Sequence, residues 1–165
     1  TLVVLVSDHG WHLGEHNFWG KHNTMEGALR VPLWWSHPRI APGVDEGLVE
    51  LVDVFPTLAR WAGVVPPEGL PGRVLIDPAT GARAAVRDQV YARFERADAV
   101  LTEAFLYARF AAPEPGEMLF DRAADPESNL NVARHPFYEE ALAAMRARLE
   151  AVLAATGGAS GDRAP

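Results

Sequence analysis

The chain opens on a continuous apolar run, residues 1–6, which reads Thr-Leu-Val-Val-Leu-Val and is rich in β-branched side chains. Such a run, without polar alternation, is typical of a strand buried on both faces in a parallel sheet. Residues 31–36 form a second run of this kind, with Pro32 near its start, where a missing N–H is tolerated. A parallel strand needs neighbours, so we expect residues upstream of Thr1 to supply the rest of the sheet.

Apolar positions at helical spacing predict two longer helices. In residues 53–62 the apolar side chains share one face, Asp53 stands at the N-cap position and Gly63 follows the end. A second helix is predicted over residues 136–155, whose apolar side chains alternate at spacings of four and three. A short helix near residues 24–29 is also expected, because Asn23 and Glu26 have the spacing of a capping box.

Three short aromatic-rich segments separated by turns, residues 89–94, 104–110 and 117–122, predict a small antiparallel sheet. The predicted organisation is therefore an α/β core over residues 1–83, a small sheet with a C-terminal helix over residues 84–155, and a disordered tail over residues 156–165.

Composition narrows the class of partner. Hydrophobic residues make up 48% and charged residues 22% of the 165, which is ordinary for a globular domain. The net charge of −7 argues against nucleic acid and membrane surfaces as partners, since both are anionic. The sequence contains no cysteine, which excludes disulfides and thiolate zinc sites.

Candidate chemistry follows the first predicted strand directly, in Ser7-Asp8-His9-Gly10. Ligand sites in open α/β sheets gather at the carboxyl ends of strands. A carboxylate beside an imidazole suits a divalent cation that accepts hard oxygen and one nitrogen, and Gly10 is expected to turn the backbone sharply. Taken alone, the pair fits better with an aspartate that caps a turn beside a hydrogen-bonded histidine.

Lys21 lies thirteen residues after Asp8 and favours a metal site over an aspartate that only caps a turn. A lysine beside a metal can hold a sulfuryl or phosphoryl group and neutralise charge as the leaving oxygen departs. Together, the acid–imidazole pair and this lysine predict an anion-binding metal site.

These motifs resemble the sulfatase family, and most of all its iduronate-2-sulfatase-like branch. The resemblance rests on Ser-Asp-His-Gly-Trp-His-Leu-Gly-Glu-His from residue 7, Trp-Gly-Lys-His-Asn from residue 19 and Arg-Val-Pro from residue 30. It continues through residues 48–63 and 70–73, and through the late motifs Leu-Phe-Asp, Asp-Pro and Asn-Leu of residues 119–130. It implies that the chain is a C-terminal fragment of an alkaline-phosphatase-like sulfatase fold.

The resemblance also implies roles for individual residues. Asp8 and His9 match metal ligands, for calcium in most of the family, although magnesium and manganese stay open because imidazole is an unusual calcium ligand. Lys21 matches the catalytic lysine that contacts the sulfate, and His22 is expected to line the substrate pocket. The family's nucleophile is a formylglycine, made within a motif that this chain lacks. We therefore expect it upstream, and expect the chain alone to be inactive.

Three alternatives stay open. A phosphonate or phosphate ester hydrolase of the same superfamily would use a similar metal pair and lysine, and a non-catalytic remnant would use neither. His12-Leu13-Gly14-Glu15-His16 also fits a zinc-protease pattern, but that chemistry needs a helix, which Gly10 and Gly14 disfavour. The expected substrate is a sulfated small molecule or sulfated sugar.

Overall fold

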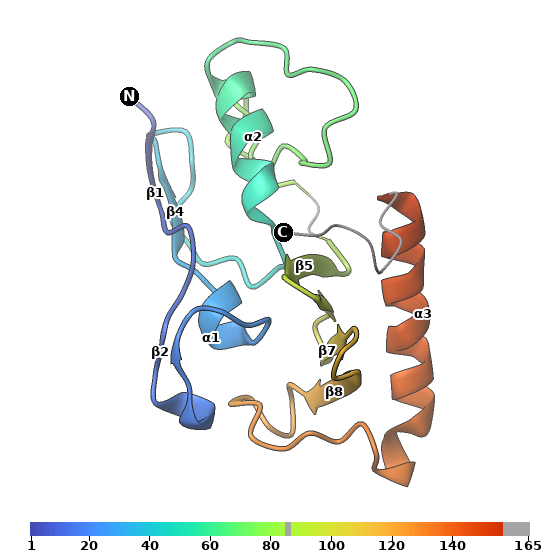
Figure 1. The fold of residues 1–165 in the computed structure, drawn as a ribbon. Helices are drawn as coiled ribbons and strands as arrows, with labels where there is room; N and C mark the ends of the chain where they lie inside the picture. The colour runs from blue at the N-terminus through green and yellow to red at the C-terminus, as the bar shows by residue number, and fades with distance from the viewer. Residues whose placement is uncertain (85–86, 157–165) are drawn as a thin grey trace. The chain divides into compact units, whose positions relative to one another are not determined.

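The computed structural model describes residues 1–84 and 87–156. Figure 1 labels the helices and strands. Contacts group the chain into two compact units, each built from two segments. Unit 1 comprises residues 1–8 and 31–88, and unit 2 comprises residues 9–30 and the described residues from 89 onward. Residues 9–30 thus group with the C-terminal sheet, while the predicted boundary near residue 83 stays a prediction. All but the first residue of the tail predicted to be disordered lies outside the described residues.

Unit 1 contains the two predicted apolar strands, which pair with each other. Strand β1 (Val3–Val6) runs antiparallel to β4 (Leu33–Ser36), with Val3 opposite Ser36 and Val6 opposite Leu33. The expectation of a parallel strand is thus wrong for the partner that β1 has in the described residues. Burial differs as well, because Val3 is 58% exposed and Trp34 is 69% exposed.

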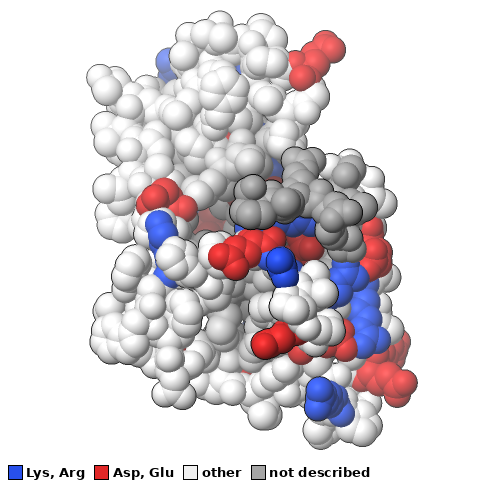
Figure 2. All heavy atoms as spheres, in the orientation of Figure 1, with Lys and Arg blue, Asp and Glu red and all other residues white. Residues whose placement is uncertain are grey.

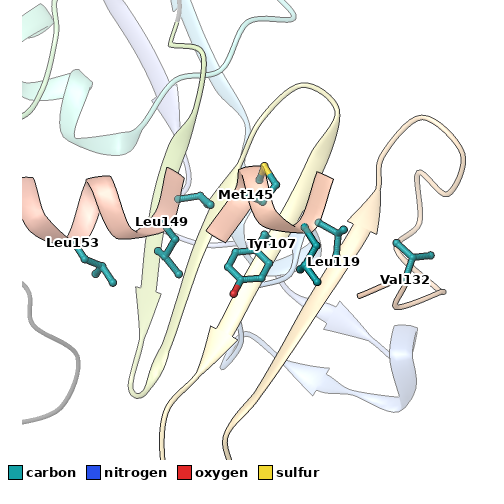
Figure 3. Packing of buried hydrophobic residues seen from close by; sticks show 8 residues of the cluster. Tyr107, Leu119, Val132, Met145, Leu149 and Leu153 are labelled. Atoms are coloured by element: carbon teal, nitrogen blue, oxygen red, sulfur yellow. The ribbon is translucent and has the colours of Figure 1, made fainter. Parts of the chain in front are cut away.

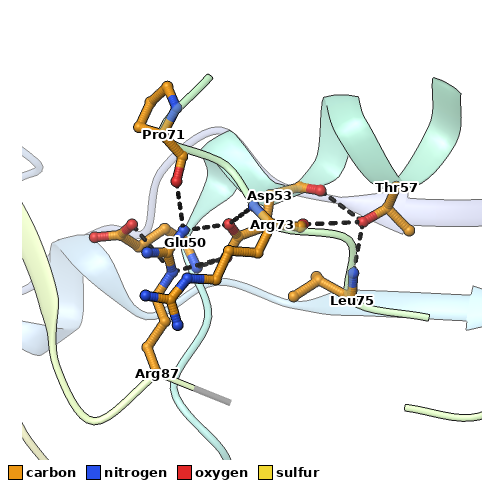
Figure 4. Close-up of polar contacts among 7 residues, drawn as sticks. All are labelled: Glu50, Asp53, Thr57, Pro71, Arg73, Leu75 and Arg87. Atoms are coloured by element: carbon orange, nitrogen blue, oxygen red, sulfur yellow. Dashed lines mark hydrogen bonds and ion pairs between the residues drawn. The ribbon is translucent and has the colours of Figure 1, made fainter. Parts of the chain in front are cut away.

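The helix predicted near residue 53 is present. A 3₁₀ turn, η2 (Leu51–Asp53), leads into α2 (Val54–Trp61). Asp53 occupies the predicted N-cap position of α2, but its side chain makes no capping bond to the helix. Its fully buried carboxylate instead accepts hydrogen bonds from the amides of Arg73, at 2.7 Å, and Glu50, at 2.9 Å. The guanidinium of Arg87 binds both oxygens of the same carboxylate (Figure 4). Burial alone would raise the pKa of Asp53, but these hydrogen bonds outweigh it and lower the pKa.

The buried Thr57 on α2 extends this network. Its Oγ1 donates to Asp53 O at 2.6 Å and accepts from the amide of Leu75 at 2.9 Å (Figure 4). Residues 71–76 are therefore held against α2 by polar contacts, which also include a bond from Trp61 Nε1 to Ile76 O at 3.0 Å.

Unit 2 is built on a four-stranded antiparallel meander in the order β5-β6-β7-β8. Three of its strands were predicted from their aromatic side chains, whereas β6 was not. The reason is that β6 reads Ala-Asp-Ala-Val-Leu, a buried run of small residues without the aromatic signal. The strands are β5 (Val90–Phe94), β6 (Ala97–Leu101), β7 (Phe105–Phe110) and β8 (Gly116–Asp121).

The C-terminal helix covers one face of this sheet, as Figure 3 shows. It begins as a 3₁₀ turn, η3 (Pro136–Tyr138), and continues as α3 (Glu139–Ala155), close to the predicted bounds. Leu149 at its centre is fully buried and belongs to one cluster with the sheet residues. That cluster comprises Val100, Tyr107, Leu119, Val132, Leu142, Met145, Leu149 and Leu153.

The outer side of α3 is charged. Arg109 pairs with Glu150, and Arg146 pairs with Glu117 of β8. In Figure 2, basic and acidic side chains are interspersed over the part of the view where α3 lies.

No helix within residues 1–84 and 87–156 has the length and apolar character needed to span a membrane.

Residues 9–30 form the remaining part of unit 2. Two short strands, β2 (His12–Leu13) and β3 (Trp19–Gly20), pair antiparallel around a 3₁₀ turn, η1 (Glu15–Asn17). The helix α1 (Glu26–Leu29) follows. The predicted capping box is wrong, since Asn23 Oδ1 accepts from the amide of Met25 at 2.9 Å and the Glu26 carboxylate binds Arg122 instead.

Candidate functional site

Two of the predicted site residues meet within unit 2. Lys21 directly follows β3, and its Nζ lies 2.6 Å from Nε2 of His9. Both side chains are partly buried. Lys21 and His9 are therefore in contact, while the roles predicted for them stay predictions.

The contacts of His9 decide which ring nitrogen carries the proton. Nδ1 lies 2.8 Å from the carbonyl oxygen of Gly10, which can only accept a hydrogen bond, so Nδ1 donates. Nε2 then holds the lone pair, and the ammonium group of Lys21 donates to it. A histidine whose Nδ1–H is held by a backbone carbonyl presents Nε2 in the form that binds metals.

Asp8 is the last residue of the first segment of unit 1, and His9 is the first residue of unit 2. The exposed Asp8 lines a shallow pocket of unit 1 at the end of β1. The convergence of its carboxylate with the pair in unit 2 stays a prediction. The pocket is otherwise lined by Leu5, Val6, Ser7, Pro32, Leu51 and Val54.

His22, predicted to line the substrate pocket, is exposed and stacks on Phe94 at the end of β5. The two rings lie 5.4 Å apart with an angle of 12° between their planes. One face of the imidazole is therefore covered by the sheet of unit 2. Its role toward substrate stays a prediction.

The segment that carries His9 lies directly on the backbone of α1. The amide of Gly10 donates to Ala28 O at 2.8 Å, and a Cβ on Gly10 would lie only 2.1 Å from Gly27 O. Gly10 is thus needed for close packing, whereas the sequence predicted a sharp turn. The neighbour that excludes a side chain at Gly10 is a backbone carbonyl, that of Gly27, which leaves no pattern in the sequence.

His12 is packed against the same glycine. A Cβ on Gly27 would lie 2.5 Å from Cε1 of His12, and the imidazole is 1% exposed. Neither of its ring nitrogens has a hydrogen-bond partner within the part of the chain that the structure describes. Edge contacts to the rings of His16 and Phe18 complete its surroundings.

The zinc-protease alternative is wrong. His12 lies in β2 and His16 adopts a left-handed backbone with φ of 57°, so the segment is not the helix that this chemistry requires. Glu15 accepts from the amide of Leu13 at 2.6 Å and serves the local turn. Among the described residues, no group of three or more His, Cys, Asp or Glu side chains could hold a metal ion.

His9 and Asp8 have the types of donor atom that a divalent metal binds, but two residues do not make a complete metal site. His9 offers an oriented imidazole, and its Nε2 already faces a cationic group in the form of the Lys21 ammonium. The exposed carboxylate of Asp8, next in the sequence, is a hard oxygen donor suited to calcium, magnesium or manganese. Both residues thus have donor atoms that suit a divalent metal, but that they bind one together stays a prediction.

Comparison with known proteins identifies the family of the chain. Residues 14–155 match the family model for N-sulphoglucosamine sulphohydrolase, C-terminal. Choline-sulfatase of Rhizobium meliloti is 36% identical over 154 residues, covering 82% of this chain and 28% of that protein. Mouse iduronate 2-sulfatase is 40% identical over 94 residues, covering 41% of this chain and 17% of that protein.

Among solved structures, the phosphonate monoester hydrolase of Agrobacterium radiobacter superposes with a TM-score of 0.81 at 28% identity. The match covers 93% of this chain and 35% of that one. The chain spans less than a third of the length of the choline-sulfatase that it matches. The fold is alkaline-phosphatase-like, and the chain belongs to the sulfatase family, to which it corresponds as a C-terminal portion.

Proposed function

We propose that the whole protein hydrolyses sulfuric esters, and that this chain supplies two metal ligands, Asp8 and His9, together with the sulfate-binding lysine, Lys21. The observation that carries the proposal is the contact between His9 Nε2 and Lys21 Nζ at 2.6 Å. It places an oriented metal-binding nitrogen beside a cationic anion-binding group, in a chain that belongs to the sulfatase family. Because Nε2 has one lone pair, metal binding there would replace the bond from Lys21 and leave the ammonium group for the anion.

The chemistry of Lys21 suits a sulfuryl group. An ammonium group carries three donors and no acceptor, and one of them points at His9 Nε2 as long as that nitrogen holds no metal. The others can donate to oxygens of an anion, and the positive charge can stabilise the ester oxygen as it leaves. Lys21 is also the only lysine in the 165 residues.

His9 and Asp8 would hold the divalent metal, calcium first and magnesium or manganese as alternatives. A metal held there would supply Lewis-acid chemistry toward the sulfuryl group. The backbone carbonyl of Gly10 fixes the imidazole through Nδ1, so that Nε2 stays a lone-pair donor. We further propose that the nucleophile, a formylglycine, lies outside this chain, which alone would be inactive.

The proposed substrate is a sulfated small molecule or sulfated sugar. His22 would line its pocket beside Lys21, with Phe94 holding the imidazole at a fixed tilt. The similarity to choline-sulfatase supports a small sulfated substrate.

A second candidate is hydrolysis of phosphonate or phosphate esters. It is favoured by the 28% identity and the TM-score of 0.81 to a phosphonate monoester hydrolase. Sulfuryl and phosphoryl groups share tetrahedral geometry, so one lysine and one metal can serve both. Comparison of kcat/KM for 4-nitrophenyl sulfate and 4-nitrophenyl phenylphosphonate by the full-length protein distinguishes them, and our proposal requires the sulfate ester to be preferred.

Protection of Lys21 from acylation tests the role of its ammonium group. The full-length protein is treated with an amine-reactive ester with and without inorganic sulfate, and acylation of Lys21 is followed by peptide mass spectrometry. Sulfate is expected to slow acylation at Lys21 but not at the N-terminal amine, because only Lys21 binds it. Equal acylation rates with and without saturating sulfate would contradict the role.

A further inference from the structure

We propose that Arg122, at the end of β8, is a positioning residue that holds His9 and Lys21 in place through Glu26 and α1. This inference rests on the proposed function, since it concerns the geometry of the proposed sulfate and metal site. All of the contacts that carry it lie within unit 2.

Arg122 joins the sheet to α1 by an unusual number of bonds. Its Nε and one terminal nitrogen donate to the two carboxylate oxygens of Glu26, the first residue of α1. Its other terminal nitrogen donates to the carbonyl oxygens of Thr102, at 2.9 Å, and Glu103, at 2.7 Å, in the β6–β7 turn. One guanidinium therefore connects the carboxyl end of β8, the neighbouring turn and a helix 96 residues away in sequence.

The ion pair is partly shielded from solvent. The side chain of Arg122 is 21% exposed and that of Glu26 is 18% exposed. Exposed pairs contribute little to stability, whereas a shielded fork with further carbonyl acceptors fixes a geometry. Lysine cannot reproduce this arrangement, because its point charge lacks the planar set of donors.

Helix α1 in turn holds the residues on both sides of the site. Gly10, next to His9, is bonded to Ala28 O, and its close approach to Gly27 leaves no room for a side chain. The ring of His12 lies against Gly27, and His12 pairs with Gly20, which directly precedes Lys21. A shift of α1 would therefore move His9 and Lys21 together.

The route from α1 to Lys21 is also direct along the chain. The amide of Asn23 donates to Lys21 O at 2.9 Å, and Asn23 Oδ1 accepts from Met25, the residue before α1. Helix α1 has only four residues, so its own hydrogen bonds cannot fix its position. The fork between Arg122 and Glu26 is the side-chain contact that does so.

The experiment compares Arg122→Met, Arg122→Lys and Glu26→Gln in the full-length protein with Arg146→Met as a matched control. Arg146 makes a similar two-pronged ion pair, but with Glu117, so that its bonds join α3 to β8. Three quantities are measured: hydrogen exchange of peptides within residues 9–30, inhibition by inorganic sulfate, and kcat with KM for 4-nitrophenyl sulfate. Exchange of residues 97–121 reports whether the sheet is folded.

Arg122→Met is expected to speed exchange in residues 9–30 about tenfold, to weaken sulfate inhibition, and to lower kcat by about 10- to 100-fold, because small misplacements of catalytic groups have effects of this size. Arg122→Lys is expected to recover only part of the loss. The double variant Glu26→Gln/Arg122→Met should be no worse than the more impaired single variant, since both break one link.

The proposal is overturned if loop exchange and sulfate inhibition stay at wild-type values in Arg122→Met. It is also overturned if Arg146→Met changes them equally, because the effect would then be general loss of sheet stability. Should Arg122→Met unfold the sheet, Glu26→Gln decides by the same readouts. If the wild-type protein releases no sulfate from esters, the proposed function fails, whereas loop exchange still decides the positioning role.

Discussion

Each of the two units is stabilised internally by a different kind of interaction. Unit 2 has an apolar core, in which Val100, Leu119 and Leu149 are fully buried between the sheet and α3 (Figure 3). In unit 1 the fully buried large side chains are polar, namely those of Asp53 and Thr57, and the apolar side chains of β1 and β4 are largely exposed. Unit 2 thus has a closed apolar core, whereas unit 1 has a polar junction and open apolar strands.

This difference in packing bears on where the candidate site residues lie. A closed core can hold a loop rigidly, and the pair formed by His9 and Lys21 belongs to unit 2. A polar junction depends on charge and therefore on pH. The strands of unit 1, with Val3 and Trp34 exposed, are suited to packing against further structure. We propose that the remaining part of the same fold covers them in the whole protein.

The largest effect is expected from a cavity in the core of unit 2. Leu149→Ala removes a fully buried side chain and should lower the free energy of unfolding by about 4 kcal/mol, within the usual range for such cavities. Urea denaturation of the 165-residue chain measures it. Leu130→Ala, at an exposed leucine, is the control and should change stability by less than about 0.5 kcal/mol.

A slightly smaller loss is expected at the polar junction of unit 1. Asp53→Ala leaves the Arg87 guanidinium and the amides of Glu50 and Arg73 without their acceptor. Breaking a buried pair from one side should cost about 3 kcal/mol. Asp45→Ala, which removes the partner of the exposed Arg83, serves as the comparison and should cost under about 1 kcal/mol in the same denaturation experiment.

The junction should also respond to acid, whereas the apolar core should not. The folded pKa of Asp53 lies below the ordinary value of 3.8, so its contribution is complete above that value and is lost as pH falls through the folded pKa. The stability difference between wild type and Asp53→Asn should therefore shrink below about pH 4. A difference that stays constant from pH 6 to pH 2.5 would contradict the assignment, and Leu149→Ala provides the pH-independent reference.

The smallest effect is expected on the open strands. Trp34→Thr should change the stability of the 165-residue chain by less than about 0.5 kcal/mol, since this side chain is mostly exposed. In the full-length protein the same change should destabilise more, if further structure covers the strand. Equal small effects in both proteins, measured by thermal unfolding, would argue against such a cover.

Local patterns in the sequence predicted much of the fold. Helical spacing identified α2 and α3, and aromatic side chains identified β5, β7 and β8. Strand β6 was missed because Ala97, Asp98 and Ala99 lack the bulky side chains by which strands are recognised. Strand β1 was expected to lie in a parallel sheet, but its partner among the described residues, β4, is antiparallel. The composition of a buried strand does not determine the direction of its partner.

For the site, a lysine near His9 could be predicted because the two residues lie in neighbouring motifs that resemble one family. The contacts that hold this pair in place could not be predicted. Glu26 was read as part of a local capping box, whereas its carboxylate binds Arg122, 96 residues away. Such long-range pairing leaves no spacing pattern in a single sequence, and it becomes visible only when the end of β8 and α1 are seen together.

The central claim is that Lys21 binds the sulfuryl group during hydrolysis of a sulfuric ester. The most direct measurement is the release of inorganic sulfate from 4-nitrophenyl sulfate by the full-length protein and its Lys21→Ala variant, with folding checked by circular dichroism. Our account predicts that the variant stays folded while kcat falls by about 100- to 1000-fold, as expected for loss of a charge-stabilising donor. Unchanged turnover in the folded variant would contradict it.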